Sequence, residues 1–224
     1  MKFTLERVTE PDIEPIDLAE MKRHLRCFAE VTTEDADITA LITGAREWVE
    51  EYTGRALIDQ TWRLTLDGSR RTCLGGDRVG GYSPGAIGFG EREWSHWIRR
   101  GEILLRRAPI LAVTSFVSVD AAGVATDIDV ATFALREASS KWPRIVPLNG
   151  ATWPAGTLRI EFRAGFADRL GSPQQGAEMV PVRLLQAMKL WAESMYDRDP
   201  VMMPLLLEVA ERLVKSERAE LQVA

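Results

Sequence analysis

The spacing of hydrophobic residues predicts a short helix near the start of the chain. Asp17 followed by Glu20 is a D-x-x-E variant of the capping box, in which carboxylates accept the unpaired N–H groups of a first helical turn. Apolar residues then recur at helical spacing: Leu18, Met21, Leu25 and Phe28. We expect this stripe to face the interior of the protein.

A longer helix is predicted to begin near Thr32 or Thr33, with Glu34 and Asp35 in a first turn where the helix dipole favours negative charge. Its apolar positions are Ile38, Leu41, Ile42, Ala45, Trp48 and Tyr52. Gly54 is expected to end it. Burying each large apolar side chain contributes about 1.5–3 kcal/mol, more than differences in helix propensity contribute. This helix therefore needs a partner surface.

The hydrophobic period changes to two at Gln60, where Trp62, Leu64 and Leu66 alternate with polar residues as in a half-buried strand. Further short strands are predicted at Glu102–Arg106, Val113–Asp120, after the Ala121–Gly123 turn, and at Phe133–Arg136, Arg144–Val146 and Thr157–Phe166. Because turns, without helices, join these strands, we expect an antiparallel β unit.

Helical spacing returns near the end of the chain, where Pro181 suits a first helical position. The apolar face that follows consists of Val182, Leu185, Met188, Leu190, Trp191 and Met195. A terminal helix is predicted after Pro204, with Leu206, Val209 and Leu213 on its apolar face. The charged residues beyond this face are Lys215, Glu217, Arg218 and Glu220. Since they cannot join an apolar core, we expect this end to project into solvent or to meet a polar partner.

Together these elements predict an α+β protein in which N- and C-terminal helices form a helical body with an inserted antiparallel β unit. Residues 1–58 are assigned to the N-terminal helical part and residues 59–167 to the β unit. Residues 168–224 are assigned to the C-terminal helices that complete the helical body.

Residues 68–101 form a glycine-rich stretch that is too long for a simple turn inside a domain. Trp94 and Trp97 lie among charged residues, so an intermolecular anchor is as reasonable as local packing. The stretch is rich in arginine, including Arg99 and Arg100, which favours an acidic partner surface. We predict that it is mobile in the free protein and becomes ordered against a neighbouring molecule.

The overall charge argues against a protein that grips nucleic acid over a broad surface. The 224 residues include 33 acidic and 28 basic ones, for a formal net charge of −5. Cys27 and Cys73 are too few for a disulfide scaffold, and no segment reaches the roughly 20 apolar residues that span a bilayer. We expect a cytoplasmically assembled protein with no membrane segment.

One serine motif resembles a catalytic nucleophile, but its surroundings do not fit. Gly81–Gly85 matches the G-x-S-x-G pattern around Ser83, yet neither the preceding strand nor the following helix of a nucleophile elbow is predicted. Pro84 has no backbone N–H to donate to an oxyanion. A flexible glycine-rich turn explains the motif better, and no catalytic residue is predicted.

Metal-ligand residues are similarly scattered. His24 and Cys27 are one helical turn apart, and Cys73 with His96 could formally complete a zinc site, but the spacing matches no short zinc signature. The carboxylate pairs Asp127 with Asp129 and Asp197 with Asp199 lie in turn-like sequence and read as solvated turn or cap residues. No phosphate-binding glycine motif occurs. We therefore predict no metal site and no cofactor.

The order of several short strings is similar to that in the tailed-phage head-tail connector (adaptor) family, which is also found in prophages and gene-transfer agents. The strings that carry this resemblance are Pro15–Glu20, Asp37–Ile42, Ala45–Leu57, Gln60–Trp62, Leu105–Ile110, Val113–Ser115, Gly150–Pro154 and the helix around Trp191. The combination from the second helix to Trp62 is the most specific part. Two regions depart from the family pattern, because residues 68–101 and the charged end after Leu213 both look extended.

The resemblance implies a structural role without catalysis. It implies a homo-oligomeric ring, a dodecamer, that docks beneath the portal protein, lengthens the DNA channel and offers a platform for a tail terminator or other tail-completion protein. DNA would pass through the lumen without sequence-specific binding. The implied location is the head-tail junction of the virion, after assembly in the cytoplasm of a bacterial host.

For such a ring we expect head-to-tail contacts between unlike surfaces. The candidate contact residues are Trp94, Trp97, Arg99, Arg100, Leu206, Val209, Leu213, Lys215 and Arg218. The segment Pro204–Ala224 is predicted to dock on the portal as a helical arm, with a frayed terminus as the alternative. Two other functions stay open at this point, namely a small hydrolase or metal-dependent enzyme, and a DNA-binding packaging factor.

Overall fold

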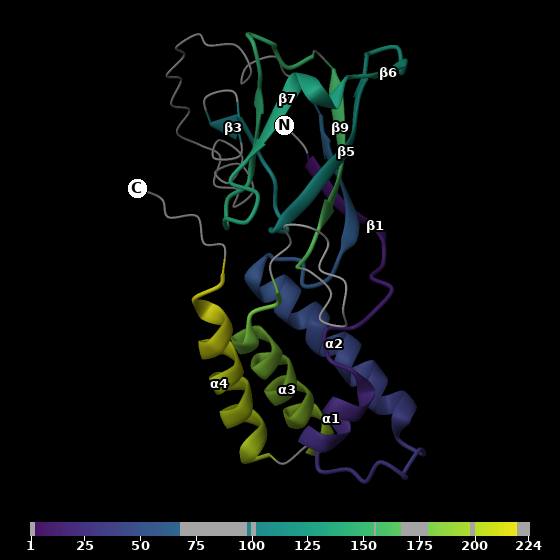
Figure 1. Cartoon of the computed structure of the whole chain (residues 1–224), viewed down its shortest axis with the longest axis vertical. Coiled ribbons are helices and arrows are strands. Elements are labelled where there is room, and N and C mark those ends of the chain that lie inside the picture. Colours follow the sequence, from purple (N-terminus) through teal and green to yellow (C-terminus); the bar gives the residue numbers. More distant parts are fainter. Residues whose placement is uncertain are drawn as a thin grey trace, which may run out of the picture. The chain divides into compact units, whose positions relative to one another are not determined.

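A computed structural model describes residues 3–67, 98–99, 102–154, 156–166, 179–197 and 200–218 (Figure 1). The elements in chain order are β1 (Phe3–Thr9), α1 (Leu18–His24), α2 (Asp35–Thr53), β2 (Gln60–Leu66), β3 (Ile98–Arg99), β4 (Glu102–Leu104), β5 (Ile110–Val119), β6 (Ala125–Asp127), the 3₁₀ turn η2 (Val130–Thr132), β7 (Phe133–Arg136), β8 (Arg144–Pro147), β9 (Thr157–Ala164), α3 (Val182–Asp197) and α4 (Met202–Lys215). The predicted α+β class is confirmed.

The chain divides into two units that alternate along the sequence. The β unit comprises Met1–Thr9, Thr61–Arg106 and Ile110–Arg163, and the helical unit comprises Glu10–Gln60, Arg107–Pro109 and Ala164–Ala224. This division differs from the three continuous regions expected from the sequence. The first residues join the β unit, and Arg107–Pro109 joins the helical unit.

The β unit consists of two sheets with mainly antiparallel pairing. One has the order β1-β2-β9-β5-β6 and the other the order β3-β4-β8-β7. In strands β2 and β9 buried positions alternate with half-buried or exposed ones, as their period of two predicts. Phe116 and Phe133 stack with ring centroids 4.7 Å apart, and Trp153 stacks on Phe133 at 4.6 Å. This aromatic stack forms part of the interior of the β unit.

Two strands of the β unit were not predicted. Strand β1 pairs antiparallel with β2, with Leu5 opposite Leu64 and Glu6 opposite Arg63. The alternation in its sequence breaks at Glu6 and Arg7, two adjacent charged residues, and in the sheet it is an edge strand beside β2. Strand β3 lies inside the glycine-rich stretch and pairs with β4, with Ile98 opposite Ile103.

In the helical unit, α1 begins as the capping box predicts, since the backbone N–H of Glu20 donates to Asp17 Oδ1 at 2.6 Å. The helix ends earlier than expected, at His24. Arg26 then adopts a left-handed conformation with φ of 58°, which turns the chain away from the helix axis. Phe28 is consequently 77% exposed, so its predicted place on a buried stripe is wrong.

The core of the helical unit lies among α2, α3 and α4. Its fully buried members include Ile38, Ile42 and Val49 of α2, Leu184 and Met188 of α3, and Ala210 and Val214 of α4. Trp48 and Trp191 stack at 6.4 Å between centroids and pack against this core, in agreement with their predicted role. Val182 was predicted to belong to the same apolar face of α3 but is exposed.

A buried carboxylate joins the end of α2 to the segment that follows it. Glu50 Oε1 accepts from the backbone N–H of Leu57 at 2.8 Å and from Gln60 Nε2 at 2.6 Å, while Oε2 accepts from Arg46 Nη1 at 3.0 Å. Burial raises the pKa of Glu50, but its neighbours here are all donors, which favours the ionised form. Arg46 also donates to Glu14 at 2.9 Å, so its charge is balanced by more than one acid and its pKa is raised.

The backbone crosses itself closely after β9, where only glycine fits. A Cβ atom on Gly165 would lie 2.3 Å from the carbonyl carbon of Ile58, and the residue has φ of +144°. This approach lets the N–H of Gly165 donate to the Pro109 carbonyl at 2.9 Å and the N–H of Phe166 donate to the Leu57 carbonyl at 3.2 Å. Gly165 therefore holds three distant segments of the helical unit together.

We predict that Glu50→Gln lowers the free energy of unfolding by about 3 kcal/mol, because Arg46 stays buried without its carboxylate and an amide N–H₂ replaces one acceptor. Glu47→Gln is the matched control on the same helix, with a half-exposed side chain, and should change the value by less than about 0.5 kcal/mol. Urea unfolding followed by circular dichroism measures both. Equal losses for the two variants would contradict the role assigned to Glu50.

Candidate interaction surfaces

The residues considered for a zinc site bind other partners. His24 Nε2 lies 3.0 Å from Glu193 Oε2, and Cys27 Sγ lies 3.2 Å from the Tyr196 hydroxyl. That hydroxyl also donates to Glu34 Oε2 at 2.6 Å, and these two contacts raise the pKa of Tyr196. No cluster of three metal-binding side chains occurs among the residues that the structure describes. Cys73 and His96 lie outside them.

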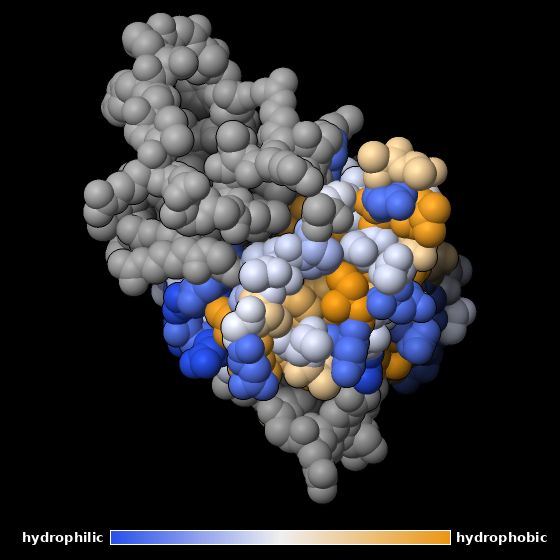
Figure 2. Space-filling view, turned by 90° about the horizontal axis from the view of Figure 1, so that it is seen from above, coloured by the Kyte–Doolittle hydropathy of each residue, from blue (hydrophilic) through white to orange (hydrophobic). Residues whose placement is uncertain are grey.

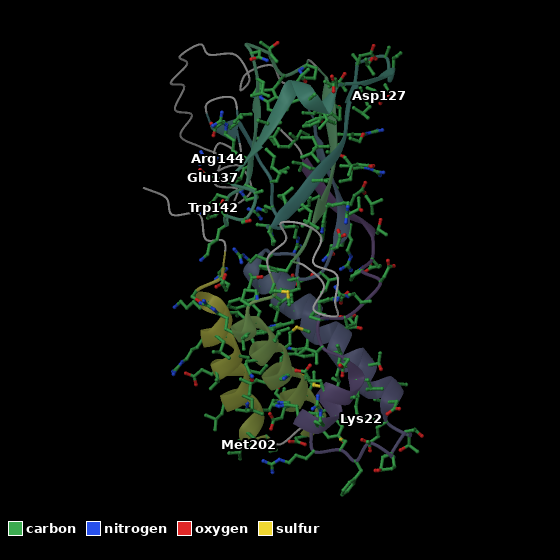
Figure 3. The ribbon with its side chains drawn as sticks, viewed as in Figure 1. Lys22, Asp127, Glu137, Trp142, Arg144 and Met202 are labelled. Atoms are coloured by element: carbon green, nitrogen blue, oxygen red, sulfur yellow. The ribbon has the colours of Figure 1, made fainter. Side chains whose placement is uncertain are left out.

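The described members of the two carboxylate pairs lie in a turn or at the end of an element. Asp129 Oδ1 accepts from the N–H of Ala131 at 2.9 Å and so caps the 3₁₀ turn. Asp127 ends the exposed strand β6 (Figure 3), and Asp197 ends α3. The prediction that these acids are turn or cap residues is confirmed for Asp129, whereas Asp127 is a strand residue and Asp197 a helical residue. Asp199 lies outside the described residues.

Several sequence candidates cannot be placed. Ser83, Trp94, Trp97 and Arg100 lie outside the described residues, and only the backbone of Arg99 is described, in strand β3. Their predicted roles stay predictions.

Two arginines of the β unit are each paired with two acids. Arg63 contacts Glu161 at 2.6 Å and Glu6 at 2.9 Å. Arg144 contacts Glu137 at 2.6 Å and Glu102 at 3.1 Å (Figure 3), and its hydrogen bond lowers the pKa of Glu137. Such pairing leaves less positive charge for a phosphate backbone.

Within the described ranges, no helix combines the length and the apolar composition needed to cross a bilayer. On the face drawn in Figure 2, hydrophobic and hydrophilic residues are interspersed over the described surface.

Helix α4 does not form a projecting arm. It begins at Met202, before Pro204, and packs along α3. Leu206 and Leu213 are half-buried, and Leu213 contacts the core. Of the predicted contact residues on this helix, Val209 and Lys215 are exposed to solvent.

Two of the charged residues after α4, Glu217 and Arg218, contact the helical unit, contrary to expectation, whereas Glu220 lies outside the described residues. Glu217 Oε2 lies 3.0 Å from Arg55 Nη1, and its Oε1 lies 3.2 Å from Arg183 Nη1. The Arg55 and Glu217 side chains are only 8% and 12% exposed. The Arg218 guanidinium lies over the ring of Tyr52, 5.3 Å from its centroid. The sequence could not reveal these contacts because their partners are far away along the chain.

The exposed side of α4 carries large apolar residues at its start and, toward its end, Arg212 and Lys215 together with the acids Glu208 and Glu211. We call this surface the outer face of α4, made of Val201, Met202, Leu205, Val209, Arg212 and Lys215. Val201 is 68% exposed and Leu205 is 52% exposed. The sequence prediction did not identify this face, because the predicted helix began after Pro204 and therefore left out Val201 and Met202.

The exposed side of α2 has a different character. We call it the outer face of α2, made of the small residues Ala36 and Ala40 and the acids Asp37, Glu47 and Glu51. Arg46, the only basic residue of this helix, is buried. Just before the helix, Phe28 and Val31 add exposed apolar surface. The two outer faces thus differ in charge.

Comparison with solved structures finds similarity along nearly the whole chain. The chain is similar to a chain in the virion of a native gene transfer agent (GTA) particle, with 27% identity and a TM-score of 0.68. It is also similar to chains in the neck of an empty GTA particle computed with C6 symmetry (27% identity, TM-score 0.66) and in the neck of a native GTA particle computed with C12 symmetry (26%, 0.65). Each match covers 99% of this chain and 97% of the other. The similarity supports the predicted class, a structural protein of a phage-like particle.

Two other comparisons give no match. No protein-family model matches the chain, and no curated protein matches it.

We predict that Glu217→Gln lowers the free energy of unfolding by about 1–3 kcal/mol, because the largely buried guanidinium of Arg55 loses its carboxylate. Glu208→Gln is the matched control, since its ion pair with Arg212 on the same helix is exposed and should contribute less than about 1 kcal/mol. Thermal unfolding of both variants gives the comparison. A Glu217 variant as stable as the Glu208 variant would restore the idea of a solvated tail.

Proposed function

We propose that this chain is a head-tail connector (adaptor) subunit, a structural protein that forms a ring beneath the portal of a phage-like particle. The observation that carries the proposal is the similarity over 99% of the chain to proteins of GTA particle necks. Because both chains are covered almost completely, the similarity concerns the whole protein and not one common substructure.

A ring of identical subunits requires a repeated contact between two unlike surfaces, since a self-complementary contact closes at a dimer. The neck of the native GTA particle was computed with C12 symmetry, which supports twelve copies for the ring. The outer faces of α2 and α4 are unlike surfaces of the kind that such a contact needs.

The proposed ring lengthens the channel through which DNA passes and offers a platform for tail-completion proteins such as a tail terminator. The net charge of −5 supports passage of DNA without tight binding, because phosphate binding depends on rows of lysine and arginine. The paired arginines Arg63 and Arg144 support the same conclusion. In this proposal the chain is not an enzyme and acts within the virion, after assembly in the host cytoplasm.

The purified chain mixed with its portal protein is expected to form rings stacked on the portal. Negative-stain electron microscopy would show them, and sedimentation would show the chain moving with the portal. The portal alone and the chain alone are the controls. A chain that stays a separate globule in the presence of portal would contradict the proposed function.

The isolated chain is expected to bind duplex DNA only weakly, with a dissociation constant no tighter than the roughly 10⁻⁴–10⁻⁶ M of non-specific binding. Fluorescence anisotropy with labelled DNA at several salt concentrations measures this. Tight binding that weakens steeply with salt would instead favour a DNA-binding packaging factor.

A further inference from the structure

The outer face of α4 is an apolar surface that the described part of this chain leaves exposed. Val201, Met202, Leu205 and Val209 are each 46% exposed or more. Burying a side chain of this size in an interface contributes about 1.5–3 kcal/mol of favourable free energy. Such a cluster on one helix is typical of a protein interface.

The outer faces of α4 and α2 lie on opposite flanks of the helical unit. Helix α3 packs against both helices far more extensively than they pack against each other (Figure 1). A contact between α4 of one copy and α2 of the next would therefore join opposite flanks. Repetition of such a contact builds a ring and not a closed dimer.

The two helices also run in the same sense, with α2 inclined to α4 (Figure 1), and their ends lie at similar levels. Near their ends, Arg218 lies over Tyr52 at 5.3 Å. Near their starts, Tyr196, at the end of α3, donates to Glu34 directly before α2 at 2.6 Å. Helix α4 starts shortly after Tyr196, and Met202 accordingly lies toward the same end of the helical unit as Lys22 in α1 (Figure 3).

Both helices rise about 1.5 Å per residue, so residues counted back equally from these two ends lie at similar heights. Chemically complementary residues of α4 and α2 then face each other when two copies meet. Counting back from Arg218 and Tyr52 brings Arg212 and Lys215 level with Glu47 and Glu51. The apolar start of α4 comes level with the start of α2, where Ala36 and Ala40 leave room for large side chains. Arg212 is 75% exposed although it pairs with Glu208 on its own helix, and Glu47 is 51% exposed although it lies 3.9 Å from Arg46, so both side chains are open to a neighbour.

We infer that the outer face of α4 binds the outer face of α2 in the next copy of this chain, and that this contact builds the ring. The inference rests on the proposed ring and names its subunit contact. Apolar residues of α4 pack on the small residues at the start of α2. At the other end, the basic residues of α4 pair with the acids of α2. Rotation about an axis along the helices preserves these levels from one copy to the next.

Charge reversal tests the contact with the full-length chain and its portal. Variant A carries Arg212→Glu and Lys215→Glu, which makes both outer faces acidic. Variant B carries Glu47→Lys and Glu51→Lys, which makes both basic. Like charges then oppose each other in a ring of A alone or B alone, and half-assembly should need about tenfold more protein or higher. An equal mixture of A and B should form rings again, because acidic α4 then meets basic α2 and the reverse.

The controls separate this inference from folding and from the proposed function. Arg136→Glu with Arg159→Glu changes the same amount of charge at exposed positions of the β unit and should leave assembly unchanged. Circular dichroism checks that A and B are folded. Leu205→Asp, at an exposed position, should also prevent ring formation without unfolding the chain.

Negative-stain imaging and native mass spectrometry count the rings. Rings from A alone and B alone at wild-type concentrations would overturn the inference, and so would folded variants whose mixture stays unassembled. If the wild-type chain itself forms no ring with the portal, that result contradicts both the proposed function and the proposed contact.

Discussion

The helical unit depends on one buried interaction, the carboxylate of Glu50 with its surrounding donors. Arg46 holds it from the same helix, and the N–H of Leu57 and the amide of Gln60 hold it from the segment after Gly54. A buried charge is tolerated only when its hydrogen bonds are complete. This requirement fixes the path of the chain after α2, beside which Gly165 and Phe166 then pack.

Local chemistry predicted local structure well. Asp17 caps α1, Gly54 ends α2 in a left-handed conformation, and the alternation from Gln60 is strand β2, because each signal acts within a few residues. The sequence predictions were wrong or incomplete where residues far apart along the chain determine the structure. Strand β1 owes its order to pairing with β2, and Glu217 is ordered by Arg55 and Arg183. The outer face of α4 was half predicted, through Val209 and Lys215, since exposure depends on which side α3 covers.

The polar groups of the described residues fit the proposed role in assembly. Among the described residues, the buried charges are bound to each other or to backbone groups, as the Arg46 and Glu50 pair illustrates, and the candidate metal residues His24 and Cys27 bind Glu193 and Tyr196. The exposed surface includes an apolar face on α4, which ends in Arg212 and Lys215 beside Glu208, and an acidic face on α2. Surfaces of opposite character on one subunit are what a closed ring needs.

The central claim is that many copies of this chain form a ring at the head-tail junction of a particle. A cryo-electron microscopy reconstruction of the particle that contains it, refined without imposed rotational symmetry, is the most direct test. We expect a closed ring of this fold directly beneath the portal, with the DNA channel running through it. Density for the chain elsewhere in the particle, or as isolated copies without a ring, would contradict the proposed role.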